Sequence, residues 1–524
     1  MSVSGWMQNE SVQSPRPTTL KPIHENARET KICADEIQRL TSPESKKTRV
    51  FSILMMAILN SCLGSSLPSN ATLFIADEFA IESQAEKALP MSCYLIGHRI
   101  AGPLLWAPLS EQRGRRSITI GTFSLFGIFT MACAVAPTWP AFLVFRTLTG
   151  IFASGPIAVV TGILADKYQG HRTRGQAVAV YMVVTAFGPL LGPIISGFVS
   201  PSLGWRWPFW IALIIIAATF VPLLTLPETH AAVLRSQDRP PHKTPHPGLN
   251  PQQEEPNRKE FITTVLFRPL HMLIFEPIVT ATSTYLALCY SIFYMSFQAY
   301  PLIFTDIYSL SPGLCGLTYR PIGLGCIITL PIFWAYDEFF AHQEPNRIRT
   351  CCLLKDNNNN NREEYIRLPI ACLGGPLFAI SLFWLGWSAR QYLPFVVSML
   401  AGVPFGLGFI CIFIALLNYL TDAYEIYAAS ANAASSCSRS LLAIVLPLAT
   451  GPMFDRLGVA GACSLLGGLS GVMCVIPLVF LWKGHRMRAS STFCARIAEG
   501  KKKRRKSRVV IEYLPLVKSL DIID

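Results

Sequence analysis

The amino-acid sequence predicts an all-α membrane protein with twelve transmembrane helices in two six-helix bundles. Of its 524 residues, 51% are hydrophobic and only 15% are charged, and the mean hydropathy is +0.38. A soluble chain carries about a quarter charged residues. Apolar runs of the roughly 20 residues that a membrane-spanning helix needs also recur along the chain. Together these observations place the chain in a membrane.

Six apolar runs precede a polar, proline-rich stretch and six follow it. The first six lie at 49–70, 88–108, 117–136, 140–163, 174–199 and 205–226, and the others at 270–296, 312–336, 367–388, 393–418, 427–450 and 458–482. The polar stretch has the composition of a linker. We therefore expect an N-terminal tail at 1–48, a bundle at 49–226, a linker at 227–268, a second bundle at 269–482 and a basic tail at 483–524.

Basic residues predict the orientation of these spans. The first 50 residues are polar and contain no secretory signal. With the N-terminus in the cytosol, the inner loops near 109–117, 165–175, 228–268 and 336–367 hold 17 Lys and Arg, far more than the outer loops hold. Because cytosolic loops collect Lys and Arg, both termini are predicted to be cytosolic.

The remaining composition argues against a nucleic-acid partner and a metal cofactor. The net charge of +13 comes mostly from the C-terminal tail, whose "KKKRRK" run suits the anionic lipid of the inner leaflet. Fifteen cysteines are scattered without a CxxC pair. We expect no cofactor, no metal site and no disulfide framework.

Three stretches of the first half carry recognisable motifs. "APLSEQRGRRS" holds Glu111, Gly114 and Arg115 between spans 2 and 3, and "RTLTGIFAS" begins at Arg146 in span 4. Glycines and prolines concentrate in "GPLLGPIISG" of span 5, residues 188–197. On its own, the first motif is a positively charged inner loop.

Together these motifs resemble the signatures of the major facilitator superfamily, and most closely its fungal twelve-span drug:proton antiporters. The resemblance covers about residues 50 to 485. It implies an inner gate, or charge network, and an antiporter helix in span 5. The inner gate would consist of Glu111, Gly114, Arg115 and Asp166, and the antiporter helix would carry Gly175, Gly188, Pro189 and Gly192. Thr149 and Val184 depart from these patterns, which expect glutamine and glycine.

The spacing in span 5 predicts close helix packing. Gly188 and Gly192 stand four residues apart, so their bare surfaces share one helix face. Pro189 and Pro193 each remove a backbone hydrogen bond and bend the helix, a defect tolerated when neighbouring helices satisfy the freed groups. We expect this face to contact the other bundle.

Polar side chains inside the spans are candidates for the substrate or proton pathway, because a charge in a membrane is costly without a function or a partner. A structural ion pair is the alternative for each arginine, and helix packing is the alternative for the small residues of span 11. Tyrosines at near-helical spacing in span 7 suit a planar or cationic solute. The candidates are Arg146, Glu276, Tyr285, Tyr290, Asn432, Ser435 and Arg439.

Proton coupling needs a titratable group that meets each side in turn. Glu276, Asp166 and His98 are the candidates, and Glu276 is preferred because the resemblance implies a latch role for Asp166. His98 and Arg99 raise a separate question, since the family usually has one residue fewer between Gly97 and Gly102. One extra residue rotates a helix by about 100°, so we expect a bulge lining the pathway, a divergence or a gene-prediction error.

These features predict a secondary active transporter that exports a small hydrophobic organic compound in exchange for protons by alternating access. Two similar halves suit rocking about a central site, and no GxxxxGK[ST] loop is present to supply ATP energy. The alternative is a polyamine exporter, or an importer of nutrients or organic solutes, with the same fold. An enzyme is not expected, because the spans lack a nucleophile or carboxylate cluster. We expect a monomer in the plasma membrane, with a vacuolar or vesicle membrane as the alternative.

Overall fold

The computed structural model is mostly helical in the part of the chain that it describes. It describes residues 44–167, 171–228, 267–342, 368–424, 427–491 and 493–494, and these residues contain no β-strand. The chain divides into two compact units, residues 1–49 and 50–524. Apart from residues 44–49, the described chain belongs to the second unit.

The first half of the second unit contains the helices expected as spans 1 to 6, with short elements at their ends. Its elements are α2 (Glu44–Ser66), η1 (Ser69–Ala71), α3 (Thr72–Glu78), α4 (Gln84–Ala101), η2 (Gly102–Trp106), α5 (Ala107–Arg113), α6 (Arg115–Ala134), α7 (Trp139–Lys167), α8 (His171–Leu203) and α9 (Trp207–Leu224).

The second half repeats this helical pattern. Its elements are α12 (Arg268–Phe275), α13 (Pro277–Asp306), α14 (Pro312–Leu317), α15 (Arg320–His342), α18 (Leu368–Ser388), α19 (Phe395–Leu400), α20 (Gly402–Tyr424), α21 (Ala428–Leu448), α22 (Thr450–Met473) and α23 (Val475–Ser490). Each expected span of this half falls on one of these helices or on a consecutive pair.

Ten helical segments among the described residues are long and apolar enough to cross a membrane. The other two expected spans fall on α4 with α5 and on α21, which are helical but more polar. His98 and Arg99 interrupt the apolar run of α4, and Asn432, Ser435 and Arg439 interrupt that of α21. The twelve-span, all-α fold class is confirmed, whereas the bounds predicted for the domains stay predictions.

The additional residue in span 2 coincides with a change of helix type. α4 ends at Ala101, and the next five residues, Gly102–Trp106, form the π-helix η2 before α5 resumes α-helical geometry. A π-helical turn accommodates one more residue than an α-helical turn. Of the three explanations, this turn favours the bulge, and the choice among them stays a prediction. The side chain of Arg99 lies outside the described structure.

The start of span 12 differs from the prediction. Residues 451–457, expected as an outer loop, are helical and belong to α22. The predicted start at 458 is instead a kink, because Gly458 has φ of 67° and ψ of 173°. L-residues other than glycine rarely adopt a positive φ, so the glycine permits the bend inside an otherwise continuous helix.

Burial separates central helices from peripheral ones. In the most apolar stretch of each span, 83% of residues are buried in α13, against 33% in α9 and 28% in the α22–α23 segment. Peripheral helices expose large apolar side chains such as Ile214, Val221 and Val472. An apolar outer surface of this kind requires a lipid environment.

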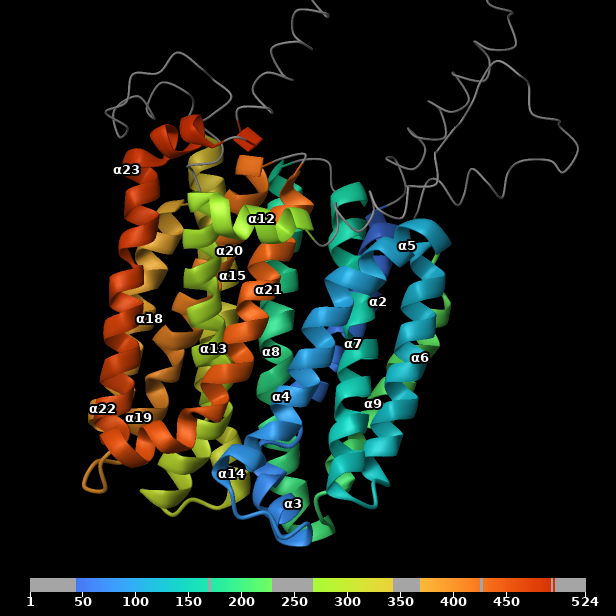
Figure 1. Cartoon of the computed structure of the whole chain (residues 1–524), viewed down its shortest axis with the longest axis vertical. Helices are drawn as coiled ribbons and strands as arrows, with labels where there is room; N and C mark the ends of the chain where they lie inside the picture. Colours follow the sequence, from blue (N-terminus) through green and yellow to red (C-terminus); the bar gives the residue numbers. More distant parts are fainter. Residues whose placement is uncertain are drawn as a thin grey trace, which may run out of the picture. The chain divides into compact units, whose positions relative to one another are not determined.

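Helix α8 packs against both halves of the unit. Its residues Val183, Ala186 and Leu190 belong to the same buried cluster as the core of the second half, whereas Ala177 and Tyr181 belong to the core of the first. Figure 1 shows α8 between the helices of the two halves, and it contacts α7 and α9 of the first half and α14, α15 and α20 of the second. A side chain on α8 can therefore face either half.

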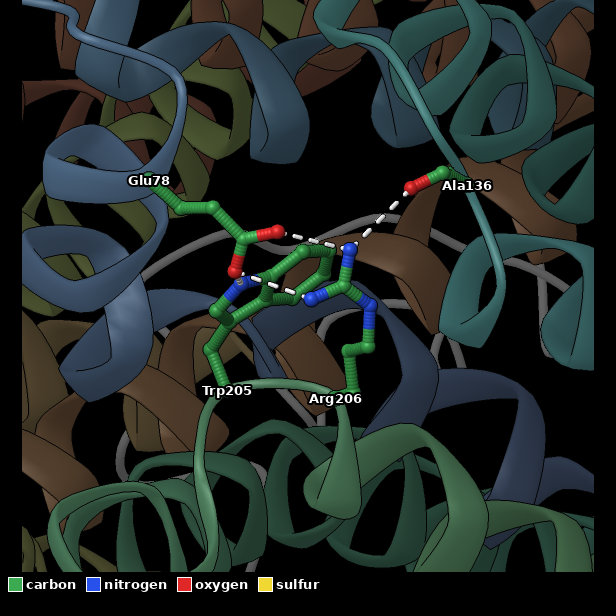
Figure 2. A network of polar contacts seen from close by, with 4 residues as sticks. All are labelled: Glu78, Ala136, Trp205 and Arg206. Carbon is green, nitrogen blue, oxygen red and sulfur yellow. Dashed lines mark hydrogen bonds and ion pairs between the residues drawn. The ribbon is translucent and has the colours of Figure 1, made fainter.

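A polar cluster joins three connections at one end of the first half (Figure 2). The Glu78 carboxylate accepts hydrogen bonds from Trp205 Nε1 at 2.6 Å and Arg206 Nη1 at 2.9 Å, and its other oxygen lies 2.7 Å from Arg206 Nη2. Arg206 also donates to the Ala136 carbonyl at 3.4 Å. The cluster links the end of α3, the α6–α7 connection and the start of α9.

Candidate functional site

A cavity lies between α8 of the first half and three helices of the second half. It encloses about 490 Å³ of space that protein atoms do not fill, including space open to solvent. Its lining residues come from the middle of α8, α13, α20 and α21. They are Tyr181, Met182, Thr185, Ala186, Tyr290, Phe293, Tyr294, Phe409, Ile410, Phe413, Leu417 and Arg439. Only about 50 Å³ of it can hold the centre of a water-sized molecule, which is below the roughly 300–1,000 Å³ of small-molecule sites, so a bound solute requires the surrounding helices to move apart.

Arg439 is the basic residue of this lining. It stands near the middle of α21, is 8% exposed, and holds its guanidinium carbon 5.6 Å from the centre of the Phe413 ring. Guanidinium over an aromatic face is a favourable cation–π arrangement. None of the lining residues that the structure describes is Asp or Glu, so the described wall carries positive charge.

Aromatic rings form much of the cavity wall. The Tyr290 and Tyr294 rings lie 4.8 Å apart between centroids, and the Phe409 and Phe413 rings lie 4.5 Å apart. The two pairs meet where Tyr290 approaches Phe413 at 6.1 Å. Both pairs are spaced four residues apart, which puts each pair on one helix face.

Tyr285 does not line this cavity. It is buried in the second half, and its hydroxyl lies 3.7 Å from Cys474 Sγ. Tyr290 stands five positions after Tyr285, so the two side chains point about 140° apart around the helix axis. Tyr285 therefore faces away from the cavity, and its place in the substrate pathway stays a prediction.

Arg146 lies wholly within the first half and is 1% exposed. Its guanidinium donates to three backbone carbonyls: Pro90 O at 3.1 Å, Gly64 O at 2.9 Å and Ser65 O at 3.1 Å. It therefore joins α7 to α2 and α4. Arg146 does not line the cavity described above, and its place in the transport pathway stays a prediction.

One residue connects Arg146 to the cavity wall. Ser65 accepts a hydrogen bond from Arg146 through its carbonyl, and its hydroxyl lies 3.3 Å from the Tyr294 hydroxyl. Because Tyr294 lines the cavity and belongs to α13, this contact crosses between the halves. A movement of α2 relative to α13 would break it.

Glu276 is buried at the start of α13, away from the cavity lining. It is 3% exposed, and its carboxylate accepts a hydrogen bond from the Tyr424 hydroxyl at 3.0 Å. Tyr424 is the last residue of α20. Glu276 therefore joins the ends of two helices that both contribute to the cavity.

Asn432 and Ser435 precede Arg439 on α21, and neither lines the cavity. The Asn432 side-chain nitrogen donates to Thr421 Oγ1 on α20 at 3.0 Å. Ser435 is fully buried and stands four residues before Arg439, so it shares the same helix face. The first contact supports the helix-packing interpretation of the small residues in span 11.

The predicted inner gate is described only in part. Glu111 and Asp166 lie on α5 and α7, and their side chains are outside the described part of the structure. Gly114 has φ of 95°, a conformation that suits glycine. The Arg115 guanidinium packs on α7, since a Cβ on Gly162 would lie 2.9 Å from Arg115 Nη2.

Glu228 completes this region and was not anticipated from the sequence. Its carboxylate accepts hydrogen bonds from the backbone nitrogens of Arg115 at 3.0 Å and Arg116 at 3.1 Å, at the start of α6. A carboxylate at a helix N-terminus satisfies unpaired N–H groups and complements the helix dipole. Because its partners are backbone nitrogens, no residue type in the sequence marks this contact. Glu228 could be noticed only as the acidic residue of "LPET", directly after span 6.

The glycines of span 5 contact a different helix from the one predicted. A Cβ on Gly188 would lie 2.6 Å from Cys62 Cβ and 2.9 Å from the Leu59 carbonyl, and one on Gly192 would lie 2.8 Å from the Ser66 carbonyl carbon. These partners belong to α2, in the same half. The predicted contact of Gly188 and Gly192 with the other bundle is therefore wrong, because their face of α8 points into the first half. Gly175 is also buried in α8.

The carbonyl freed by Pro193 is satisfied as expected. Pro193 has no N–H to donate to the Pro189 carbonyl four residues earlier. The Ser66 hydroxyl donates to that carbonyl at 2.5 Å instead. The bend at the prolines of α8 is thus supported by α2.

Contacts between the halves use the opposite face of α8 and the end of α2. A Cβ on Gly316 of α14 would lie 2.6 Å from the Pro193 carbonyl oxygen. The Asn70 side-chain nitrogen donates to the carbonyls of Pro193 at 3.0 Å and Pro312 at 3.1 Å, and the Ser69 hydroxyl donates to the Phe297 carbonyl at 2.6 Å. These contacts hold the two halves together near the α2–α3 connection.

Two six-helix halves around a partly aromatic cavity define a membrane transporter. The chain belongs to the Major Facilitator Superfamily, whose family model matches residues 50–447. It is 35% identical over 446 residues to the MFS-type transporter acdC of Aspergillus candidus, which covers 83% of this chain and 84% of that protein.

Further comparisons agree with this family. The chain is 32% identical to the efflux pump FUB11 of Gibberella moniliformis, over 90% of this chain and 78% of that protein. A solved structure of the proton:xylose symporter XylE matches with a TM-score of 0.58 at 19% identity, covering 83% of this chain and 96% of that one. At that identity the likeness supports the fold. The predicted resemblance to the superfamily and its fungal efflux transporters is confirmed.

Proposed function

We propose that this transporter exports a small hydrophobic organic compound from the cytosol in exchange for protons. The observation that carries the proposal is the aromatic cavity between α8 and the helices α13, α20 and α21, at the middle of the spans and between the two halves. Central sites between repeated halves suit alternating access. The name "efflux pump" of a relative supports export.

Alternating access requires one end of the cavity to be closed while the other opens. We assign the end that carries Asn70, Pro193 and Pro312 to the outside, with both termini in the cytosol. The hydrogen bonds of Asn70 to both prolines would then close the outer end. In this scheme the inner gate acts at the inner end through Glu111, Gly114, Arg115 and Asp166. The bend of α8 is supported by the residues of the antiporter helix, Gly175, Gly188, Pro189 and Gly192.

Glu276 is our candidate for the proton-carrying group. It is buried and receives a hydrogen bond from Tyr424. It lies at the start of α13, beside the end of α20. Protonation of a buried carboxylate removes its charge and alters the hydrogen bond that it accepts. Loading and release of a proton would therefore change the contact between two cavity-forming helices.

The cavity disfavours the polyamine alternative. A polycation needs carboxylates, and the described lining residues include Arg439 but no Asp or Glu. Each chain supplies a cavity from its own helices, so we propose that it works as a monomer. The plasma membrane is the proposed location, because export from the cell takes place there.

Purified protein in proteoliposomes tests the proposal. We expect efflux of fluorescent aromatic compounds to rise when an opposing proton gradient is imposed and to fall to the level of empty liposomes after a protonophore is added. A substrate flux that is independent of the pH gradient would refute proton exchange. Flux equal to that of empty liposomes across a panel of neutral, acidic and basic aromatic compounds would refute transport of this class.

A further inference from the structure

We propose that the substrate is a planar aromatic acid, bound as its carboxylate or phenolate anion between Arg439 and the aromatic rings of α13 and α20. This inference rests on the proposed function only in taking the central cavity as the substrate site. It adds a substrate class and the residue that selects it.

The cation of the site supplies the first argument. Arg439 is 8% exposed and lines the cavity near the middle of its helix. A guanidinium is always charged, donates up to five hydrogen bonds and accepts none. It pairs with a planar carboxylate through two parallel hydrogen bonds. A positive group at such a depth therefore favours an anionic ligand over a neutral one of the same shape.

The charge of the surrounding wall supplies the second argument. The other described lining residues are aliphatic, aromatic or hydroxyl-bearing, and none is acidic. In a low-dielectric site an unfavourable like-charge contact is strong, so Arg439 repels a cationic ligand that enters the cavity. The lining therefore discriminates between the two signs of charge.

The shape of the wall supplies the third argument. Tyr290 and Tyr294 on α13, and Phe409 and Phe413 on α20, form two pairs of neighbouring rings, with Tyr290 and Phe413 6.1 Å apart. Aromatic faces and edges bind planar rings in offset-stacked or edge-to-face geometry. Arg439 lies over Phe413, so the charged group and the ring surface adjoin. A ligand with an acid group attached to a ring matches both.

Membrane energetics are compatible with this class. A weak aromatic acid crosses a bilayer in its neutral form and accumulates in the cytosol as an anion, so its removal needs a protein. Outward movement of one negative charge is favoured by an inside-negative potential by about 50-fold per 100 mV. Proton entry would add to this driving force. An exporter with an anion-selective site therefore works in the direction that the cell's gradients favour.

Binding of three matched probes to the purified full-length protein tests the proposal. The probes are 2-naphthoate, its methyl ester and 2-naphthylmethylammonium, which share the bicyclic ring and differ in charge. We expect equilibrium dialysis at neutral pH to give at least tenfold tighter binding of 2-naphthoate than of either other probe. Equal affinities for the three probes in the wild-type protein would overturn the proposal without any variant.

Variants assign the preference to Arg439. We expect Arg439→Gln to abolish the preference for 2-naphthoate while ester binding changes less than threefold, and Arg439→Lys to retain part of it. Arg390→Gln is the matched control, because Arg390 also lies over aromatic rings, at 5.7 Å from Trp387, but on an exposed connection. A preference unchanged in folded Arg439→Gln protein would overturn the assignment.

The outcomes for substrate class and for proton exchange are separable. Acid-selective binding lost in Arg439→Gln, together with flux that ignores a pH gradient, would support the substrate class and refute proton exchange. Gradient-driven flux of the ester, together with equal binding of the three probes, would refute the substrate class and support proton exchange.

Discussion

The side-chain amide of Asn70 lies 3.1 Å from the carbonyl oxygen of Pro312 and so joins the first half of the transporter to the second. The same nitrogen donates to Pro193 on α8 at 3.0 Å. Space for this bridge exists because Gly197 has no side chain, since a Cβ there would lie 3.0 Å from the Asn70 nitrogen. One amide thus spans two helices that must separate if this end opens.

Replacement of Asn70 by Ala should loosen this end of the molecule. Each lost hydrogen bond contributes about 1 kcal/mol, and 1.4 kcal/mol shifts an equilibrium tenfold. We expect spin labels at exposed Leu203 and Leu314 to show a larger population of long distances in the Asn70→Ala protein. Thr72→Val is the control, because the Thr72 hydroxyl donates to the carbonyls of Pro68 and Ser69 within its own turn. An unchanged distance distribution would contradict a closing role for Asn70.

The sequon "NAT" at Asn70 should remain unglycosylated. The Asn70 side chain is buried, and both of its N–H groups are engaged by carbonyls. A glycan requires an accessible surface amide. We expect digestion with an endoglycosidase to leave the electrophoretic mobility of the wild-type protein unchanged, as it leaves that of Asn70→Gln unchanged. A mobility shift in the wild-type protein alone would show that Asn70 is exposed during synthesis and remains modified.

Gly192→Leu should prevent stable folding rather than selectively impair transport. The new side chain would enter the backbone of α2, since even a Cβ lies 2.8 Å from the Ser66 carbonyl carbon and 2.9 Å from the Leu67 nitrogen. Overpacking in a tight contact costs 1–3 kcal/mol or more. Gly121→Leu is the matched control, because nothing lies within 4 Å of its Cβ position on α6. Equal yields of monodisperse protein for the two variants would contradict this assignment.

Ser66→Ala should destabilise the protein through the carbonyl of Pro189. A buried carbonyl without a donor costs about 1–3 kcal/mol. In Ser66→Ala/Pro193→Ala, residue 193 regains an N–H that can donate to Pro189 within α8. We therefore expect the loss in Tm caused by Ser66→Ala to be smaller in the Pro193→Ala background than in the wild type. Additive losses would show that the Ser66 hydroxyl acts elsewhere.

The helices could be predicted from the sequence because apolar runs of span length leave a strong signal. The helix that packs against the glycines of span 5 could not be predicted. Gly188 and Gly192 share a face by their spacing, but whether that face meets α2 or the second half depends on the rotation of α8 in the bundle. The π-helical turn at Gly102–Trp106 could be anticipated in part, because one inserted residue must be absorbed locally or rotate the helix.

The site was harder to predict for chemical reasons. Arg439 stood out because charge is rare in a span, but Phe409 and Phe413 lie in an apolar run where a cavity-lining ring cannot be told from a lipid-facing one. Arg146 also stood out, yet its partners are backbone carbonyls, which have no sequence signature. Ser66 and Glu228 were missed for the same reason.

Glu276→Gln should separate substrate movement from proton movement. Glutamine keeps the size of the side chain and an oxygen that can accept from the Tyr424 hydroxyl, which donates to Glu276 at 3.0 Å, but it cannot be deprotonated. We expect folded Glu276→Gln protein to bind substrate within about threefold of wild type and to lose stimulation by a pH gradient in proteoliposomes. Tyr424→Phe keeps the carboxylate and should retain gradient-driven flux with an altered pH dependence. Retention of full stimulation in Glu276→Gln would show that another group carries the proton.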